Sequence, residues 1–251
     1  MLHLGPLHDR AASRNAPAED APPDWPACFA ALAESARDAR LRDFYAAGVP
    51  HGDTPLAQVP MLAMDIETTG LNPLRDGIVS VGLVPMSLDC IRASGARHWI
   101  VKPRVPLAGE SVTIHGITDS QVDAAPDLIE CLDEILRTMA GHVMIVHCRA
   151  IEREFLNAAL RRRIGEDIRF PVIDTMELEA RLYRKRKPNL IDRLLRRKQV
   201  SIRLGDSRKR YHLPRYRPHH AVTDALATAE LLQAQIAHRF SQDTPLAQLW
   251  R

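Results

Sequence analysis

The chain of 251 residues carries 34 basic and 31 acidic side chains, a net charge of +3, and 45% hydrophobic residues. This size and composition are typical of a globular domain with an appendage and exclude a largely disordered chain. No apolar run approaches the roughly 18 residues of a membrane span, and the N-terminus lacks the apolar centre of a secretory signal. The four cysteines show no C-x-x-C spacing, which argues against a zinc knuckle or a disulfide framework, and we expect a cytoplasmic protein.

Composition and periodicity divide the chain into four segments. We expect a flexible tail at 1–24, an N-terminal helical extension at 25–59, a main domain at 60–240 and a C-terminal tail at 241–251. The extension is too small to form its own core and is expected to pack on the main domain. The sequence DTPLAQ occurs at 53–58 and again at 243–248, and its Thr-Pro pairs are typical of capped helical turns. We assign no function to this repeat.

The main domain alternates strand-like and helical segments. Strands are predicted at 61–66, 77–84, 91–101, 143–146 and 170–173, and helices at 127–139, at 151–163, after the last strand to 181, and at 221–237. A three-stranded meander followed by alternating helices and strands predicts an α/β sandwich with a mixed sheet.

Positive charge is concentrated between residues 181 and 210, where 13 Lys or Arg residues accompany only two acidic residues. Residues 1–60, by contrast, contain five Arg residues and eight acidic residues. Such segregation points to a polyanionic partner such as nucleic acid. A solvated basic helix face would show the same composition.

Two acidic residues, Asp65 and Glu67, end the first predicted strand of the main domain. Residues two positions apart on a strand point to the same face, so the two carboxylates would project together. Their repulsion and desolvation would be offset by a divalent cation, and hard oxygen ligands favour Mg²⁺ or Mn²⁺. The alternative is an ordinary exposed pair of acids at a strand end.

Two further acids are expected near this pair. Asp224 lies early in the last predicted helix, beside His219 and His220, and Glu152 lies near the start of the helix that follows strand 143–146. Strand and helix termini meet at one end of an α/β sheet, so the four carboxylates could converge. Four carboxylates and a histidine are the groups that two-metal phosphodiester hydrolysis requires, with the histidine taking the proton from water.

Three sequence stretches, MDIETTGLNP, VTIHGIT and HHAVTDALATAELL, together resemble the DnaQ-like 3′–5′ exonucleases of the RNase H-like superfamily, in the branch with a catalytic histidine. The resemblance covers about residues 60–238. It implies an RNase H-like mixed five-stranded sheet flanked by helices, in an exonuclease domain at 60–240. The residues that it assigns to the metal ions are Asp65, Glu67 and Asp224, and it assigns the general base to His219. It also implies that Thr68, His115 and Gly116 hold the terminal nucleotide, and that Leu71 and Ile117 pack against its base.

One position departs from the family pattern. The second motif usually reads H-N-x-x-F-D, whereas this chain has His147 through Glu152, with Glu152 at the place of the aspartate. The longer side chain can still reach a metal ion, so we expect activity, although a binding protein without turnover is an alternative. A second point stays open: helical spacing favours His220 as the base, and the family spacing selects His219.

The sequence therefore predicts a metal-dependent 3′–5′ exonuclease that uses two Mg²⁺ or Mn²⁺ ions on the 3′ ends of single-stranded DNA. An exoribonuclease or oligonucleotidase of the same fold is the nearest alternative. The basic stretch between the second and third motifs would supply sequence-independent phosphate contacts. No membrane partner is expected, and residues 1–60 are a candidate docking segment for a partner protein.

Overall fold

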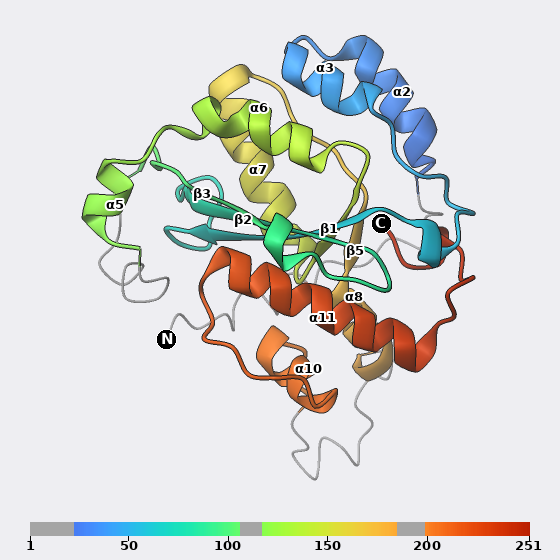
Figure 1. The fold of residues 1–251 in the computed structure, drawn as a ribbon. Helices are drawn as coiled ribbons and strands as arrows, with labels where there is room; N and C mark the ends of the chain where they lie inside the picture. Colours follow the sequence, from blue (N-terminus) through green and yellow to red (C-terminus); the bar gives the residue numbers. More distant parts are fainter. Residues whose placement is uncertain (1–22, 106–116, 185–198) are drawn as a thin grey trace, which may run out of the picture.

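The computed structural model describes residues 23–105, 117–184 and 199–251 and contains one five-stranded sheet (Figure 1). Its strands are β1 (Met61–Thr68), β2 (Ile78–Met86), β3 (Arg97–Ile100), β4 (Val143–Val146) and β5 (Val172–Asp174). They lie in the order β3-β2-β1-β4-β5. The first three strands pair antiparallel, and β4 pairs parallel with both β1 and β5. The predicted mixed sheet is therefore confirmed.

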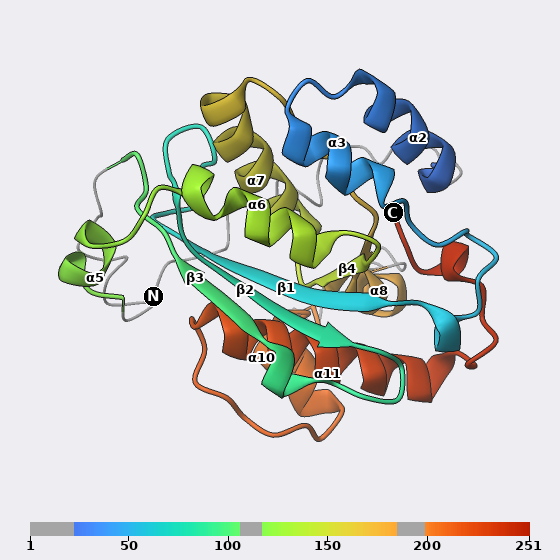
Figure 2. The same cartoon turned by 45° about the horizontal axis from the view of Figure 1, so that its top comes forward.

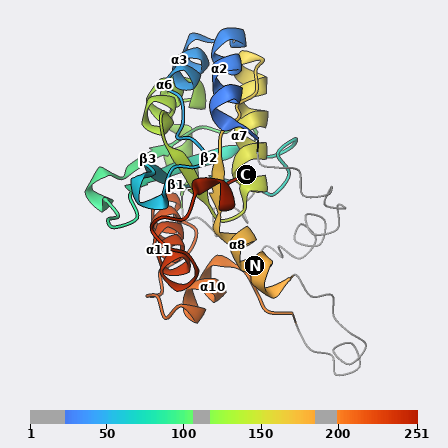
Figure 3. The ribbon, with the colours of Figure 1, turned by 90° about the vertical axis from the view of Figure 1, so that its right-hand side faces the viewer.

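Helices cover both faces of this sheet (Figures 2 and 3). They are α2 (Trp25–Ser35), α3 (Ala39–Ala46), α5 (Asp119–Asp123), α6 (Leu128–Met139), α7 (Arg149–Ile164), α8 (Thr175–Tyr183), α10 (Leu204–Arg210) and α11 (Ala221–Arg239). Helix α11 packs on β1 and β2 from one side, with α10 outside it, whereas α6 and α7 lie on the other side beneath α2 and α3. Among the described residues, no helix combines the length and the apolar character needed to cross a membrane.

Two features of the sheet and helices differ from the sequence expectation. The strand predicted at 91–101 is limited to β3, because Ala93–Gly95 form a 3-10 turn and Ile91 pairs with Met86 only as an isolated bridge. The short helices α5 and α10 were not predicted, since five and seven residues are too few for a periodic apolar pattern. A capping box between Thr118 and Gln121 starts α5.

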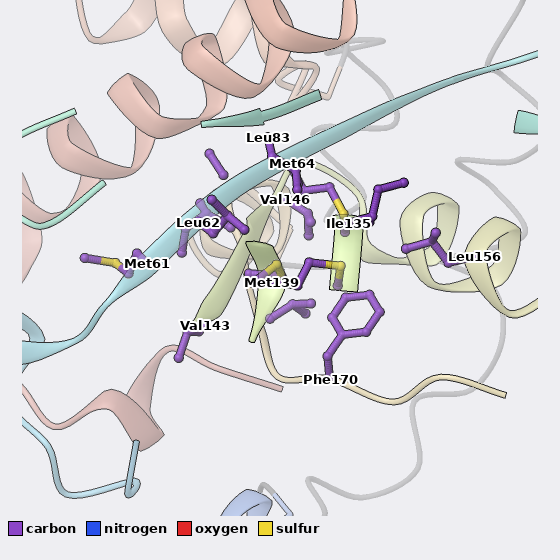
Figure 4. Packing of buried hydrophobic residues seen from close by; sticks show 14 of the residues in the cluster. Met61, Leu62, Met64, Leu83, Ile135, Met139, Val143, Val146, Leu156 and Phe170 are labelled. Carbon is purple, nitrogen blue, oxygen red and sulfur yellow. The ribbon is translucent and has the colours of Figure 1, made fainter. Parts of the chain in front are cut away.

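The two faces of β1 are buried in one continuous hydrophobic core (Figure 4). Met61, Leu62 and Met64 are fully buried, and α6 and α7 supply apolar side chains such as Ile135 and Leu156. The N-terminal helices join the same core through an aromatic cluster of Trp25, Phe29, Phe44 and Tyr45. The extension at 25–59 thus packs on the main domain, as a piece without its own core must.

The last eleven residues, expected to be a tail, are part of the fold. Leu246, Leu249 and Trp250 are buried, and Trp250 is only 2% exposed. Arg251 exchanges two backbone hydrogen bonds with Val172, which extends the sheet beyond β5. The expectation of a C-terminal tail is corrected, because three large apolar side chains within this segment are covered by the domain.

The two copies of DTPLAQ pair with each other. Pro55 and Pro245 face each other in an antiparallel bridge. The Leu56 N–H donates to the Thr244 carbonyl at 3.1 Å, and the Leu246 N–H donates to the Thr54 carbonyl at 3.0 Å. The repeat therefore joins the N-terminal extension to the C-terminal segment.

Candidate active site

Asp65 and Glu67 lie near the end of β1 and point to the same face of the sheet. Asp65 stands opposite Gly82 of β2, so this face is the one covered by α11. Burial raises the pKa of the Asp65 carboxyl well above its ordinary value, and the nearby charges of Glu67, Asp224 and Glu152 raise it further. Burial, then the charge of Asp224, raises the pKa of Glu67 to about 8. The charges of these carboxylates therefore act on one another.

The first turn of α11 brings Asp224 to these residues. Its carboxylate accepts a hydrogen bond of 2.6 Å from the backbone N–H of His219, which precedes the helix. His219 has a φ of 69°, a left-handed conformation that is uncommon for a residue with a side chain. One possible ligand atom each from Glu67, His219 and Asp224 lies within 4.8 Å of the other two. These three side chains therefore share one small space.

The two neighbouring histidines have different surroundings. His220 is the N-cap of α11: its Nδ1 accepts a hydrogen bond of 3.4 Å from the Thr223 N–H, and its ring lies 4.9 Å from that of His98. His219 is exposed and belongs to the carboxylate cluster instead. The structure therefore gives His220 a helix-capping contact and places His219 beside Glu67 and Asp224.

Glu152 lies in the first turn of α7, the helix on the opposite side of the sheet from α11, and its charge acts on Asp65. It is 3% exposed, and its Oε2 atom has no hydrogen-bond partner among the described residues. Burial raises its pKa well above the ordinary value, and the charge of Asp174 adds to this effect. A buried carboxylate oxygen without a donor is costly, so an added cation would relieve a real deficit at this position.

Asp174, at the end of β5, is a buried acid that the sequence analysis did not single out. Its carboxylate accepts hydrogen bonds from the backbone N–H groups of Arg149, Met176 and Glu177, and it caps α8. The sequence signal that could have identified Asp174 is its position directly before a predicted helical segment, which is typical of a helix cap. Because its oxygens are already bonded to these amides, Asp174 orders the ends of α7 and α8 around the site.

The donor set fits a hard divalent cation. Each of the four predicted carboxylates has a raised pKa, and burial is the largest cause for all of them. For Asp65 and Glu67, the negative charges of neighbouring carboxylates raise the pKa further. Oxygen ligands of this kind are the ones that Mg²⁺, Mn²⁺ and Ca²⁺ prefer. A dication would supply the positive charge that these acids need in order to ionise together.

The predicted substrate-binding residues lie in different surroundings. The Thr68 hydroxyl donates to the Gly70 carbonyl at 2.6 Å, directly after the acidic pair, and Leu71 is half-buried in the loop that follows. Ile117 is 7% exposed and packs with Val79 and Val122, so its side chain faces the protein interior. The other two predicted positions, His115 and Gly116, lie outside the described residues.

Part of the basic stretch has a structural role. Residues 185–198 lie outside the described part of the chain. Arg208 is buried and pairs with Glu230 at 2.6 Å, and Arg210 pairs with the fully buried Glu179. These two guanidinium groups hold α10 against α11 and α8, so their assignment to phosphate contacts is corrected.

Comparison with known proteins gives consistent matches. The family model described as "Exonuclease" matches residues 62–232. The chain is 30% identical over 182 residues to a DNA polymerase III subunit epsilon-like protein of Rhodobacter capsulatus, covering 71% of this chain and 24% of that protein. It is 26% identical over 182 residues to the PolC-type DNA polymerase III of Bacillus subtilis, covering 70% and 11%. The chain thus spans a quarter or less of these relatives.

Solved structures share the fold. The nuclease domain of 3′hExo, a DEDDh family member bound to rAMP, superposes with a TM-score of 0.60 at 16% identity, covering 72% of this chain and 92% of that one. Exonuclease X in complex with 5′ overhanging duplex DNA superposes with a TM-score of 0.55 at 21% identity, covering 75% and 98%.

Proposed function

This chain belongs to the exonuclease family, and from that premise we propose that it is a metal-dependent 3′–5′ exonuclease that shortens single-stranded DNA. The observation that carries the proposal is the cluster of Glu67, Asp224 and His219, together with the effect of the Glu67, Asp224 and Glu152 charges on Asp65. An acid cluster of this kind with an adjacent base matches the needs of phosphodiester hydrolysis.

We propose that the four carboxylates hold two divalent ions, Mg²⁺ or Mn²⁺. Bound ions would lower the pKa of the attacking water and stabilise the leaving 3′ oxygen. Glu152 takes the place of a shorter aspartate, and its unbonded Oε2 supports a ligand role for the longer side chain.

His219 would act as the general base, because it is exposed to water and lies within the acid cluster. The bond from its backbone N–H to Asp224 fixes the histidine relative to a metal-holding carboxylate. Thr68 and Leu71, directly after the acidic pair, would position the terminal nucleotide so that its phosphodiester faces His219. The same arrangement can accept RNA, which the test below separates from DNA.

We propose a polymerase as the protein partner, because the first relative above is named as epsilon-like. The helical extension at 25–59 is the proposed docking segment, and a cytoplasmic location would suit this role. Charged substitutions on the exposed face of α2 would then weaken capture of the polymerase in a pull-down and leave nuclease activity unchanged.

The proposal is tested with 5′-labelled single-stranded DNA and RNA of the same sequence, each with Mg²⁺ or Mn²⁺. Controls are EDTA and the Asp65→Asn variant. We expect a ladder that shortens from the 3′ end of the DNA and is lost in both controls. Tight binding of both strands without any metal-dependent shortening would overturn the proposal in favour of a binding protein.

A further inference from the structure

The loop that joins β1 to β2 is closed by its own hydrogen bonds. The Thr69 N–H donates to the Gly77 carbonyl at 2.9 Å, and the Asn72 N–H donates to the Asp76 carboxylate at 2.8 Å. The Asp76 N–H returns a bond of 2.7 Å to the Asn72 carbonyl. This loop starts two residues after Glu67, so its position is fixed directly beside the acid cluster.

Arg162 fastens the loop to α7. Its guanidinium donates to the carbonyls of Pro73 at 3.0 Å and Leu74 at 2.6 Å. Arg162 lies in the last turn of the helix whose first turn carries Glu152. The two residues are ten positions apart, which corresponds to about 15 Å along the helix axis. The loop tip is therefore held at the Arg162 end of α7, whereas Glu152 lies at the other end of that helix.

The tip of this fixed loop presents an apolar side chain to solvent. Leu74 is 80% exposed, whereas the next large hydrophobic residue among those described, Leu182, is 46% exposed. Arg75 beside it is exposed and forms no ion pair within the described part of the chain. A single exposed leucine is ordinary on a flexible loop, but here the backbone beneath it is rigid and a free cation adjoins it.

We propose that Leu74 and Arg75 form a second contact for the substrate strand, upstream of the terminal nucleotide. Leu74 would pack against a nucleobase, and Arg75 would bind a backbone phosphate. The occupant is a nucleic-acid strand because the loop continues directly from the acid cluster and offers an apolar side chain with an unpaired positive charge. The inference rests on the proposed nuclease function.

The position of this contact specifies a substrate class. In the proposed arrangement the strand runs along α7, where the about 15 Å between Glu152 and Arg162 corresponds to roughly four nucleotides stacked about 3.4 Å apart. A strand of many nucleotides would reach Leu74, whereas a dinucleotide would not. The protein would therefore favour longer strands and would be a poor oligonucleotidase.

The test compares Leu74→Ala with Leu182→Ala, a matched exposed leucine away from the loop. Binding of a fluorescent strand of about 20 nucleotides and of a trinucleotide is measured by anisotropy in EDTA, and KM and kcat are measured on both with Mn²⁺. For Leu74→Ala we expect Kd and KM on the long strand to rise about fivefold to tenfold, with kcat and the trinucleotide values unchanged. Leu182→Ala should match the wild type on both substrates.

Arg162→Gln tests the support of the loop. We expect it to weaken binding of the long strand as Leu74→Ala does, with no further loss in the double variant, because both act on one contact. The inference would be overturned if Leu74→Ala bound the long strand as tightly as the wild type does, or if it lost affinity equally for the long strand and the trinucleotide. Failure of the wild type to cleave would contradict the nuclease proposal alone, since the anisotropy measurement does not depend on cleavage.

Discussion

Asp65 of β1 lies directly opposite Gly82 of β2, and the missing side chain at Gly82 gives the start of α11 room to reach the sheet. A Cβ atom at this position would lie 2.4 Å from the backbone carbonyl carbon of Ala221. Asp224 follows Ala221 by three residues. The close approach of strand and helix is thus what brings the carboxylates of Asp65 and Asp224 together.

Gly82→Ala should therefore disable the site without touching an acid. The added methyl collides with helix backbone, which cannot rotate away, so α11 and Asp224 must shift. We expect a loss of kcat of about 100-fold or more, since a displacement near 1 Å can have that effect, together with a lower Tm. Gly205→Ala is the matched control: no atom lies within 4 Å of its Cβ, and Ala suits a helix. Equal activity of the two variants would contradict this account.

Substitutions of His219 and His220 should have different effects on activity and stability. His219→Gln is expected to lower kcat by about 100-fold to 10,000-fold, the range for loss of a general base, with little change in Tm. His220→Gln removes the cap of α11 and should cost about 1 kcal/mol of stability while keeping most of the activity. Kinetics and thermal unfolding of both variants test this. The reverse pattern would assign the base to His220.

Removal of one buried acid should stabilise the metal-free protein. Asp65→Asn relieves repulsion with Glu67, Asp224 and Glu152, and we expect its Tm in EDTA to rise by a few degrees, equivalent to about 1–2 kcal/mol. Mn²⁺ should raise the Tm of the wild type but not of the variant, because only the wild type keeps the full ligand set. The same shift with Mn²⁺ in both proteins would count against Asp65 as a ligand.

The stability of the metal-free protein should fall as the pH rises from about 6.5 to about 8. Burial raises the pKa of Glu67 from 4.5 to about 8, so the folded protein holds this proton when the unfolded chain has lost it, and stability declines through that window. The lowered pKa of His98 acts in the opposite sense, but only below its ordinary value of 6.5. We expect Tm in EDTA to fall between about pH 6.5 and 8 and to level off above that, with a smaller fall for Glu67→Gln. A flat or rising profile in the wild type would refute the assignment.

Much of this architecture could be predicted from the sequence. The fold class and the family are confirmed. The main helices could be predicted because long amphipathic segments such as α6 and α11 carry a clear periodic signal. The acidic residues were predictable because strand geometry fixes the shared face of Asp65 and Glu67. For the two histidines, helical spacing favours His220 and the family spacing selects His219, and neither spacing reveals the left-handed backbone at His219.

Long-range pairing explains the remaining differences. Arg208 and Arg210 read as part of a basic surface, yet their partners Glu230 and Glu179 lie 22 and 31 residues away in the chain. The three large apolar side chains of the C-terminal segment are too few for a periodic pattern, and its pairing with the first DTPLAQ copy depends on the folded domain. Neither these ion pairs nor this pairing of distant segments can be predicted from composition.

The most direct test of the central claim follows the first nucleotide to leave. A single-stranded DNA labelled differently at its 5′ and 3′ ends is mixed with the protein and Mn²⁺ in a single-turnover time course. The account predicts that the 3′ label leaves first, as a mononucleotide, while the 5′ label remains on a strand shortened by one residue at a time. Release of the 3′ label on longer fragments, or its retention at all times with the strand bound, would contradict the account.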